Sequence, residues 1–224
     1  TVEAVEHALA RGRWDAGAYK SPDGTVAPGQ DDHTIHCPPG EICHGTCAYW
    51  EADTALTGLS LLAFLGAGHT QIDGGKHAKT VARGLEFLLA SQKPDGDLRG
   101  DSKAVGMYCH SMAALALCEA YALTGDARLR RPVERAVNFL VLAQAPGGMG
   151  WRYSPRERLG DTSVLGWVVM VLKSAREVGI PIAEPVRAGT LLWLDRVAAG
   201  PARGLARYQP GKEVTPSMTA EASW

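Results

Sequence analysis

A recurring segment constrains the fold of this chain more than any other feature. Val81 to Gln92 is echoed by Val133 to Gln144, 52 residues later, and most positions of the two segments agree in residue type. A third copy runs from Val186 to Val197, and residues 2–13 resemble a degenerate earlier copy. A period of this length is typical of arrays in which each supersecondary unit buries its apolar face against its neighbours.

More apolar segments alternate with these copies and have the signals of helices. They span Thr54–Ala67, His110–Thr124 and Thr162–Val178, and a fourth begins near Ser217. Polar residues suited to cap a helix precede them, and glycines suited to end a helix follow. Expected starts are Asp53-Thr54, His110-Ser111, Asp161-Thr162 and Thr215, and expected ends are Gly68, Gly125 and Gly179. Pro132 and Pro185 are expected in the first turns of the helices that the repeated copies form.

The two sets of segments differ in polarity. One set is apolar nearly all round, as at Leu115–Cys118, whereas the repeated copies carry charges on one face, as at Arg83 and Glu86. This difference predicts inner and outer helices. We therefore expect one all-α domain over residues 1–224, with about four tandem helical hairpins that form an α/α toroid or an incomplete arc of one. An irregular, Cys/His-rich loop is expected at residues 15–49.

Composition excludes several classes of partner. The net charge is −1, with 23 basic and 24 acidic residues, so no strong field favours nucleic acid. The longest apolar stretches, such as Ser163–Leu172, are shorter than the roughly 20 residues of a membrane span, so we expect no transmembrane segment. No signal-peptide pattern is visible, which leaves the compartment open with a slight preference for the cytoplasm.

The connectors carry a resemblance to known families. Gln92-x-x-x-Gly96 and Gln144-x-x-x-Gly148, the latter followed by Trp151, resemble the QW motif of squalene cyclases. Much of the chain after Tyr49 is similar to bacterial prenyltransferase and squalene oxidase repeat proteins, over residues 56–72, 81–95, 107–126 and 160–182. Complete rings in such families have about six hairpins. The resemblance thus implies a fragment of a longer chain, or an arc completed by a second subunit, and we favour the fragment.

Squalene-type cyclases have an Asp-x-Asp-Asp-Thr-Ala motif whose middle acid protonates the substrate. The nearest match runs from Trp50 to Ala55 and has Ala52 at the catalytic position, so the proton donor is absent unless Glu51 replaces it. The alternative interpretation of Asp53 is a helix N-cap, as at Asp161.

Protein prenyltransferases hold zinc with an Asp-x-Cys pair and a histidine at the starts of inner helices. Asp53 matches the aspartate, Ala55 replaces the cysteine, and His110 falls where the transferase histidine would lie, beside Cys109. Zinc at Asp53, His110 and a cysteine is one interpretation. The other is that His110 forms structural hydrogen bonds.

Residues 33–47 contain six Cys or His side chains within a Gly/Pro-rich segment. Zinc would stabilise a loop that has too little apolar surface for its own core. The expected metal ligands are Cys37, Cys43, His44 and Cys47. A Cys37–Cys43 or Cys43–Cys47 disulfide and free thiols remain alternatives.

Aromatic and acidic residues near the inner-helix starts suggest a binding cavity. We expect Trp50, Glu51, Tyr108 and Tyr153 to bind ligand, whereas core packing is favoured for Trp167. The predicted function is binding of an apolar isoprenoid or lipid, or of a peptide, in a central cavity. The alternative is an active terpene cyclase or zinc-dependent prenyltransferase, with Asp53, His110 and Asp161 at the cavity mouth.

Overall fold

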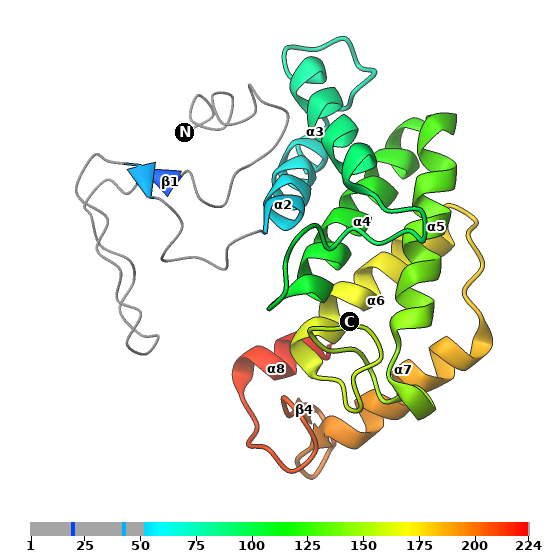
Figure 1. Cartoon of the computed structure of the whole chain (residues 1–224). Helices are drawn as coiled ribbons and strands as arrows, with labels where there is room; N and C mark the ends of the chain where they lie inside the picture. Colours follow the sequence, from blue (N-terminus) through cyan, green and yellow to red (C-terminus); the bar gives the residue numbers. More distant parts are fainter. Residues whose placement is uncertain (1–18, 21–41, 44–51, 224) are drawn as a thin grey trace.

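The computed structural model of the protein describes residues 19–20, 42–43 and 52–223 (Figure 1). Seven α-helices make up most of this part, which confirms the all-α prediction. Two short antiparallel strand pairs accompany them. β1 (Tyr19–Lys20) pairs with β2 (Ile42–Cys43), and β3 (Ala198–Ala199) pairs with β4 (Leu205–Ala206). Most of the predicted loop at residues 15–49 lies outside the described residues.

The helices form two alternating sets, as the repeat predicts. The inner set is α2 (Asp53–Gly66), α4 (Gly106–Thr124), α6 (Thr162–Glu177) and α8 (Pro216–Glu221). The outer set is α3 (Ala78–Ser91), α5 (Ala127–Ala143) and α7 (Glu184–Val197). Successive inner helices pack on one another, α3 packs on α2, and α5 packs on α4 and α6. α7 lies against the short 3₁₀-helix η2 (Pro146–Gly148). The described chain is therefore an array of helical hairpins.

The inner helices hold the core. On α4, Met107, Cys109 and residues 113–118 are buried, which explains why its sequence is apolar nearly all round. Gly58 allows α2 to approach α4 closely, since a Cβ atom there would lie 2.6 Å from the Met112 carbonyl oxygen. No helix in the described ranges is long and apolar enough to cross a membrane.

Several predicted helix ends are confirmed. The Asp161 carboxylate caps α6 by accepting a 2.9 Å hydrogen bond from Val164 N, and Thr215 caps α8 by accepting one of 3.2 Å from Met218 N. Gly125 directly follows α4 with a φ of 61°, in the left-handed region where glycine lacks the steric penalty of a Cβ atom. These caps satisfy backbone groups that a helix end leaves unpaired.

Other predicted starts are wrong. α5 begins at Ala127, because Asp126 accepts a hydrogen bond from Arg128 N, and Pro132 therefore lies inside the helix. α4 begins at Gly106, four residues before His110, and Met107 N there donates to the Tyr153 carbonyl. Asp53 is the first residue of α2, not its N-cap, which is Ala52. The backbone N–H groups at the starts of α5 and α4 thus bond to Asp126 and to the Tyr153 carbonyl, which both lie outside the expected segments.

Two glutamines connect successive outer helices. Gln92 Nε2 donates to the Pro132 carbonyl of α5 at 2.9 Å, and Gln144 Nε2 donates to the Val186 carbonyl of α7 at 3.3 Å. Arg135 of α5 completes the first contact by donating to Gln92 Oε1 at 2.7 Å. Each glutamine thus ties the end of one outer helix to the backbone of the next.

Glycines let the connectors lie directly on the next outer helix. A Cβ atom at Gly96 would collide with the carbonyl of Arg135, and one at Gly148 would lie 2.7 Å from Gly189 Cα. Both glycines have positive φ, at 94° and 71°. The contact between neighbouring hairpins therefore needs glycine for space as well as for conformation.

We predict that Gly96→Ala destabilises the protein by roughly 3 kcal/mol, because it combines left-handed strain with a collision against backbone. The matched control is Gly68→Ala, since Gly68 has a φ of 83° but open space around its Cα. The Gly68→Ala variant should lose about 1 kcal/mol of unfolding free energy. Urea denaturation of both variants would measure the difference. Equal losses would show that the connector can shift away from α5.

Candidate functional site

A buried carboxylate lies where the inner helices α4 and α6 begin. Asp161 has no exposed surface. Its Oδ1 accepts hydrogen bonds from Val164 N at 2.9 Å and from Ser163 Oγ at 2.8 Å, and its Oδ2 accepts one from the Tyr208 hydroxyl at 3.1 Å. Arg152 Nε lies 3.7 Å from Oδ2. Asp161 thus organises side chains from one helix and two connectors.

Two further hydrogen bonds extend this arrangement. The Tyr108 hydroxyl donates to Ser163 Oγ at 2.6 Å, and the hydroxyls of Tyr153 and Tyr208 lie 2.8 Å apart. The rings of Tyr108 and Tyr153 lie 6.0 Å apart between centroids. We call Asp161, Ser163, Tyr108, Tyr153 and Tyr208 the tyrosine–aspartate network. It joins α4, α6 and the connectors that follow α5 and α7.

Backbone hydrogen bonds hold the connectors after α5 and α7 at the tyrosine–aspartate network. Met107 N of α4 donates to the Tyr153 carbonyl at 3.0 Å, and Thr162 N of α6 donates to the Tyr208 carbonyl at 3.0 Å. In each case the donor lies 46 residues before the acceptor, so the same contact recurs in successive hairpins. The repeat thereby brings Tyr153 and Tyr208 side by side.

Burial sets the protonation of the network. It raises the pKa of the Asp161 carboxyl above its ordinary value, against the opposing hydrogen bonds from Val164, Ser163 and Tyr208. Burial also raises the pKa of Tyr108 to about 12 and that of Tyr208 well above its usual range. The Tyr108 and Tyr208 hydroxyls therefore remain protonated and can donate hydrogen bonds at neutral pH.

A stripe of side chains runs from the network along α4 and α6. Its residues are spaced by three or four, so they share one face of each helix. The Tyr108–Ser163 bond joins the two helices at one end, and Glu119 accepts a 2.6 Å bond from Ser174 Oγ at the other. We call this set the inner stripe: Tyr108, Met112, Leu115 and Glu119 on α4, and Ser163, Trp167, Met170 and Ser174 on α6.

Glu221 of α8 lies beside this region. Its carboxylate packs against α6 at Gly166, where a Cβ atom would occupy the same space. Burial raises the pKa of Glu221, and its charge contributes to the raised pKa of Tyr108. A second acidic side chain is therefore near the end of the inner stripe that carries Tyr108.

The structure brings together three of the predicted site residues. Asp161, Tyr108 and Tyr153 belong to the tyrosine–aspartate network. Asp53 lies elsewhere, near Cys109, whose thiol pKa is raised by burial and by the Asp53 charge. Trp50, Glu51, Cys37, His44 and Cys47 lie outside the described residues, as does the side chain of Cys43.

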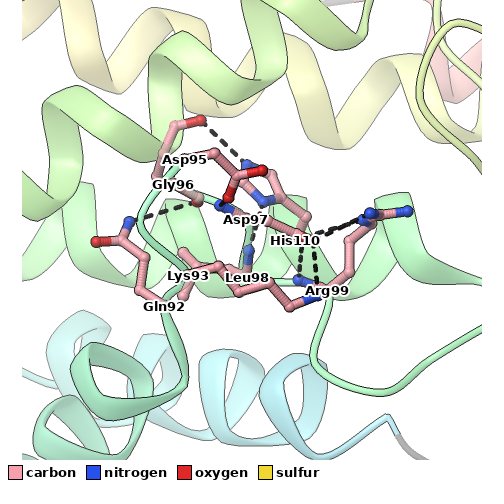
Figure 2. Close-up of polar contacts among 9 residues, drawn as sticks. Gln92, Lys93, Asp95, Gly96, Asp97, Leu98, Arg99 and His110 are labelled. Atoms are coloured by element: carbon pink, nitrogen blue, oxygen red, sulfur yellow. Dashed lines mark hydrogen bonds and ion pairs between the residues drawn. The ribbon is translucent and has the colours of Figure 1, made fainter.

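His110 is fully buried, and both of its ring nitrogens bond to backbone (Figure 2). Nδ1 accepts a 3.0 Å hydrogen bond from Leu98 N, and Nε2 lies 3.1 Å from the Ala136 carbonyl. Since Leu98 N can only donate and the carbonyl can only accept, the ring must be neutral with its proton on Nε2. His110 therefore ties the connector after α3 to both α4 and α5.

The same connector contains a buried carboxylate, Asp97, that pairs with two partly exposed cations (Figure 2). Asp97 accepts bonds of 3.0 Å from Arg99 Nε and from Lys93 Nζ. Burial acts to raise the pKa of Asp97, but its bonds to Arg99 and Lys93 outweigh this effect and lower the pKa to about 2. These charges hold the connector in the conformation that presents Leu98 N to His110.

No group of three or more Cys, His, Asp or Glu side chains suited to a metal ion occurs among the side chains that the structure describes. Sequence reasoning did not assign Ser163, Arg152, Glu221 or Tyr208 to the site. The signal for Tyr208 was available, since it repeats Tyr153 after 55 residues. The roles of Ser163 and Glu221 depend on contacts between separate hairpins, and that of Arg152 depends on how the connector before α6 folds back on Asp161.

The two-layer array of hairpins defines a terpene-cyclase-like α-helical fold. The structure is similar to that of ent-copalyl diphosphate synthase from Streptomyces platensis, with a TM-score of 0.50 and 20% sequence identity. The similarity covers 86% of this chain and 34% of that protein, so the chain spans about a third of its length. No family model matches the chain, and no curated protein matches its sequence.

Protonation of His110 should destabilise the fold. Burial lowers the pKa of His110 from 6.5 to about 4. The unfolded state therefore binds the proton first, and this contribution to stability is present above pH 6.5 and lost as pH falls to about 4. The loss should be roughly 3 kcal/mol. Urea denaturation of wild type and His110→Gln between pH 4 and 7.5 would isolate it, since other groups are common to both. A pH-independent difference would contradict the neutral, buried imidazole.

Proposed function

We propose that the inner stripe binds an apolar chain of the isoprenoid or lipid class. Tyr108, Met112, Trp167 and Met170 are half-buried, although they lie on the helices that hold the core. A face with large apolar side chains that the fold leaves partly exposed is typical of a binding surface. This incomplete burial carries the proposal.

The length and ends of the stripe suit such a ligand. Tyr108 and Glu119 are eleven residues apart on α4, or roughly 16 Å along the helix axis. At each end of the stripe, a polar side chain of α4 is hydrogen-bonded to one of α6. The middle of the stripe therefore offers mainly apolar contact to a ligand. A peptide is less suitable because its backbone amides would need hydrogen-bond partners there.

The tyrosine–aspartate network would orient a polar end of the ligand. Ser163 and Tyr208 donate hydrogen bonds to Asp161, and Tyr108 donates to Ser163, so Tyr108 and Ser163 are the members that also lie on the stripe. A hydroxyl or other acceptor on the ligand could replace Ser163 as the partner of Tyr108 at little cost. The network would therefore fix direction, whereas the apolar side chains would supply most of the affinity.

The residues support binding more directly than catalysis. Both nitrogens of His110 are bonded to backbone, so its use as a base or zinc ligand would require one of these bonds to break. Asp161 remains the acidic group best placed for chemistry, because it is buried at the end of the stripe. The fold neighbour is named for the synthesis of ent-copalyl diphosphate, which suggests isoprenoids as the first ligands to test.

Farnesol binding tests the proposal. Titration calorimetry should show saturable binding to the wild type, and Trp167→Ala should weaken it by at least tenfold, because the indole is the largest apolar group on the stripe. The matched control is Leu191→Ala, which removes a side chain that is 52% exposed on α7. It should leave affinity unchanged. The proposal fails if farnesol does not saturate or if both variants bind alike.

We also propose that Cys37, Cys43, His44 and Cys47 hold a structural zinc ion, since four such donors suit tetrahedral zinc. The purified protein should then contain one equivalent of zinc, and Cys43→Ala should lose it while His110→Ala keeps it. Elemental analysis under reducing conditions would measure both. Zinc-free wild type would exclude the site, and loss of zinc only in His110→Ala would locate it among the inner helices.

A further inference from the structure

A hollow of about 630 Å³ opens on the outer side of the array, away from the inner stripe. It lies between the end of α5, the η2 segment and the start of α7. Its volume is in the range of small-molecule sites. The apolar part of its lining includes Val141, Leu142, Pro185, Ala188 and Leu192.

One position at which the repeats differ lies in the hollow. In the preceding hairpin, Arg135 lies at the corresponding position of α5 and donates a 2.7 Å hydrogen bond to Gln92 Oε1. Ala188 replaces this arginine on α7, while Gln144 still donates to the next outer helix as Gln92 does. The glutamine contact between hairpins is therefore kept, but the arginine that bonds to the first glutamine has a short counterpart at the hollow.

Two exposed leucines form the apolar part of this hollow that a ligand could cover. Leu142 is 59% exposed and Leu192 is 40% exposed, and they line it from α5 and α7 respectively. The position equivalent to Leu142 on α3 is Ala90. The hollow thus combines the loss of a charged side chain with the gain of a large apolar one.

Arg156 contributes a single positive charge to the same hollow. Its backbone has a φ of 58°, which is costly for a residue with a Cβ atom, and its N–H donates to the Ala143 carbonyl at 2.8 Å. No carboxylate in residues 52–223 forms an ion pair with it, since the nearby Glu157 and Glu184 pair with Arg152 and Arg187. A strained conformation therefore holds an available cation beside the leucines.

We propose that this hollow is a binding site for a small amphiphilic carboxylate. The aliphatic part of the ligand would lie against Leu142 and Leu192, and its carboxylate would pair with the Arg156 guanidinium. An exposed charge pair adds modest affinity, whereas apolar burial supplies the rest. The site is independent of the inner stripe and does not rest on the function proposed above.

Decanoate is a suitable probe, with decanol as its uncharged counterpart. Calorimetric titration of the wild type should show saturable decanoate binding and about threefold weaker decanol binding. Ala188→Arg restores the side chain of the preceding repeat, so it should fill the hollow, preserve the fold and abolish the binding. Arg156→Gly relieves the positive-φ strain and removes the charge, so it should keep stability and weaken decanoate binding by about threefold.

Arg203→Gly is the matched control, because Arg203 is the other non-glycine residue with positive φ in the described ranges and lies outside this hollow. It should bind decanoate like the wild type. Decanoate binding that persists in Ala188→Arg would belong elsewhere, such as the inner stripe, and would overturn this site. Absence of saturable binding, or equal affinity for decanol, would also overturn it.

Discussion

The contact between each connector and the next outer helix is the interaction on which the array depends. Gln92 and Gln144 each donate to a backbone carbonyl of the following outer helix, and Gly96 and Gly148 let the chain lie flat against it. Because one hairpin cannot bury its inner helix alone, this contact sets how far each hairpin is displaced from the last. A displacement repeated in this way keeps successive inner helices side by side.

That regular displacement also creates the candidate site. Around the site, side chains 55 residues apart meet in the pairs Tyr108–Ser163, Tyr153–Tyr208 and Glu119–Ser174. Two of these pairs belong to the network around Asp161, and the third closes the far end of the inner stripe. The polar ends and the apolar middle of the stripe are therefore products of the same repeat that builds the fold. The outer hollow is different, because it contains Ala188, a position at which the repeat is not kept.

The sequence predicted the parts of this structure that depend on local pattern. The offset of 52 residues indicated the alternating helices, and Asp161 and Thr215 were recognisable as caps because their bonds reach only three residues along the chain. The starts of α4 and α5 were misplaced because His110 and Pro132 resemble helix starts locally. Likewise, the structural role of His110 depends on Leu98 and Ala136, which no local pattern connects to it.

We propose that an apolar ligand lies on the inner stripe, between the network at Asp161 and the Glu119–Ser174 pair. Photolabelling with a diazirine analogue of farnesol, followed by peptide mapping, tests it most directly. We predict that the label attaches to peptides of α4 and α6 that contain Met112, Trp167 or Met170, and that unlabelled farnesol prevents this. Label confined to outer helices, or label that farnesol does not displace, would contradict the claim.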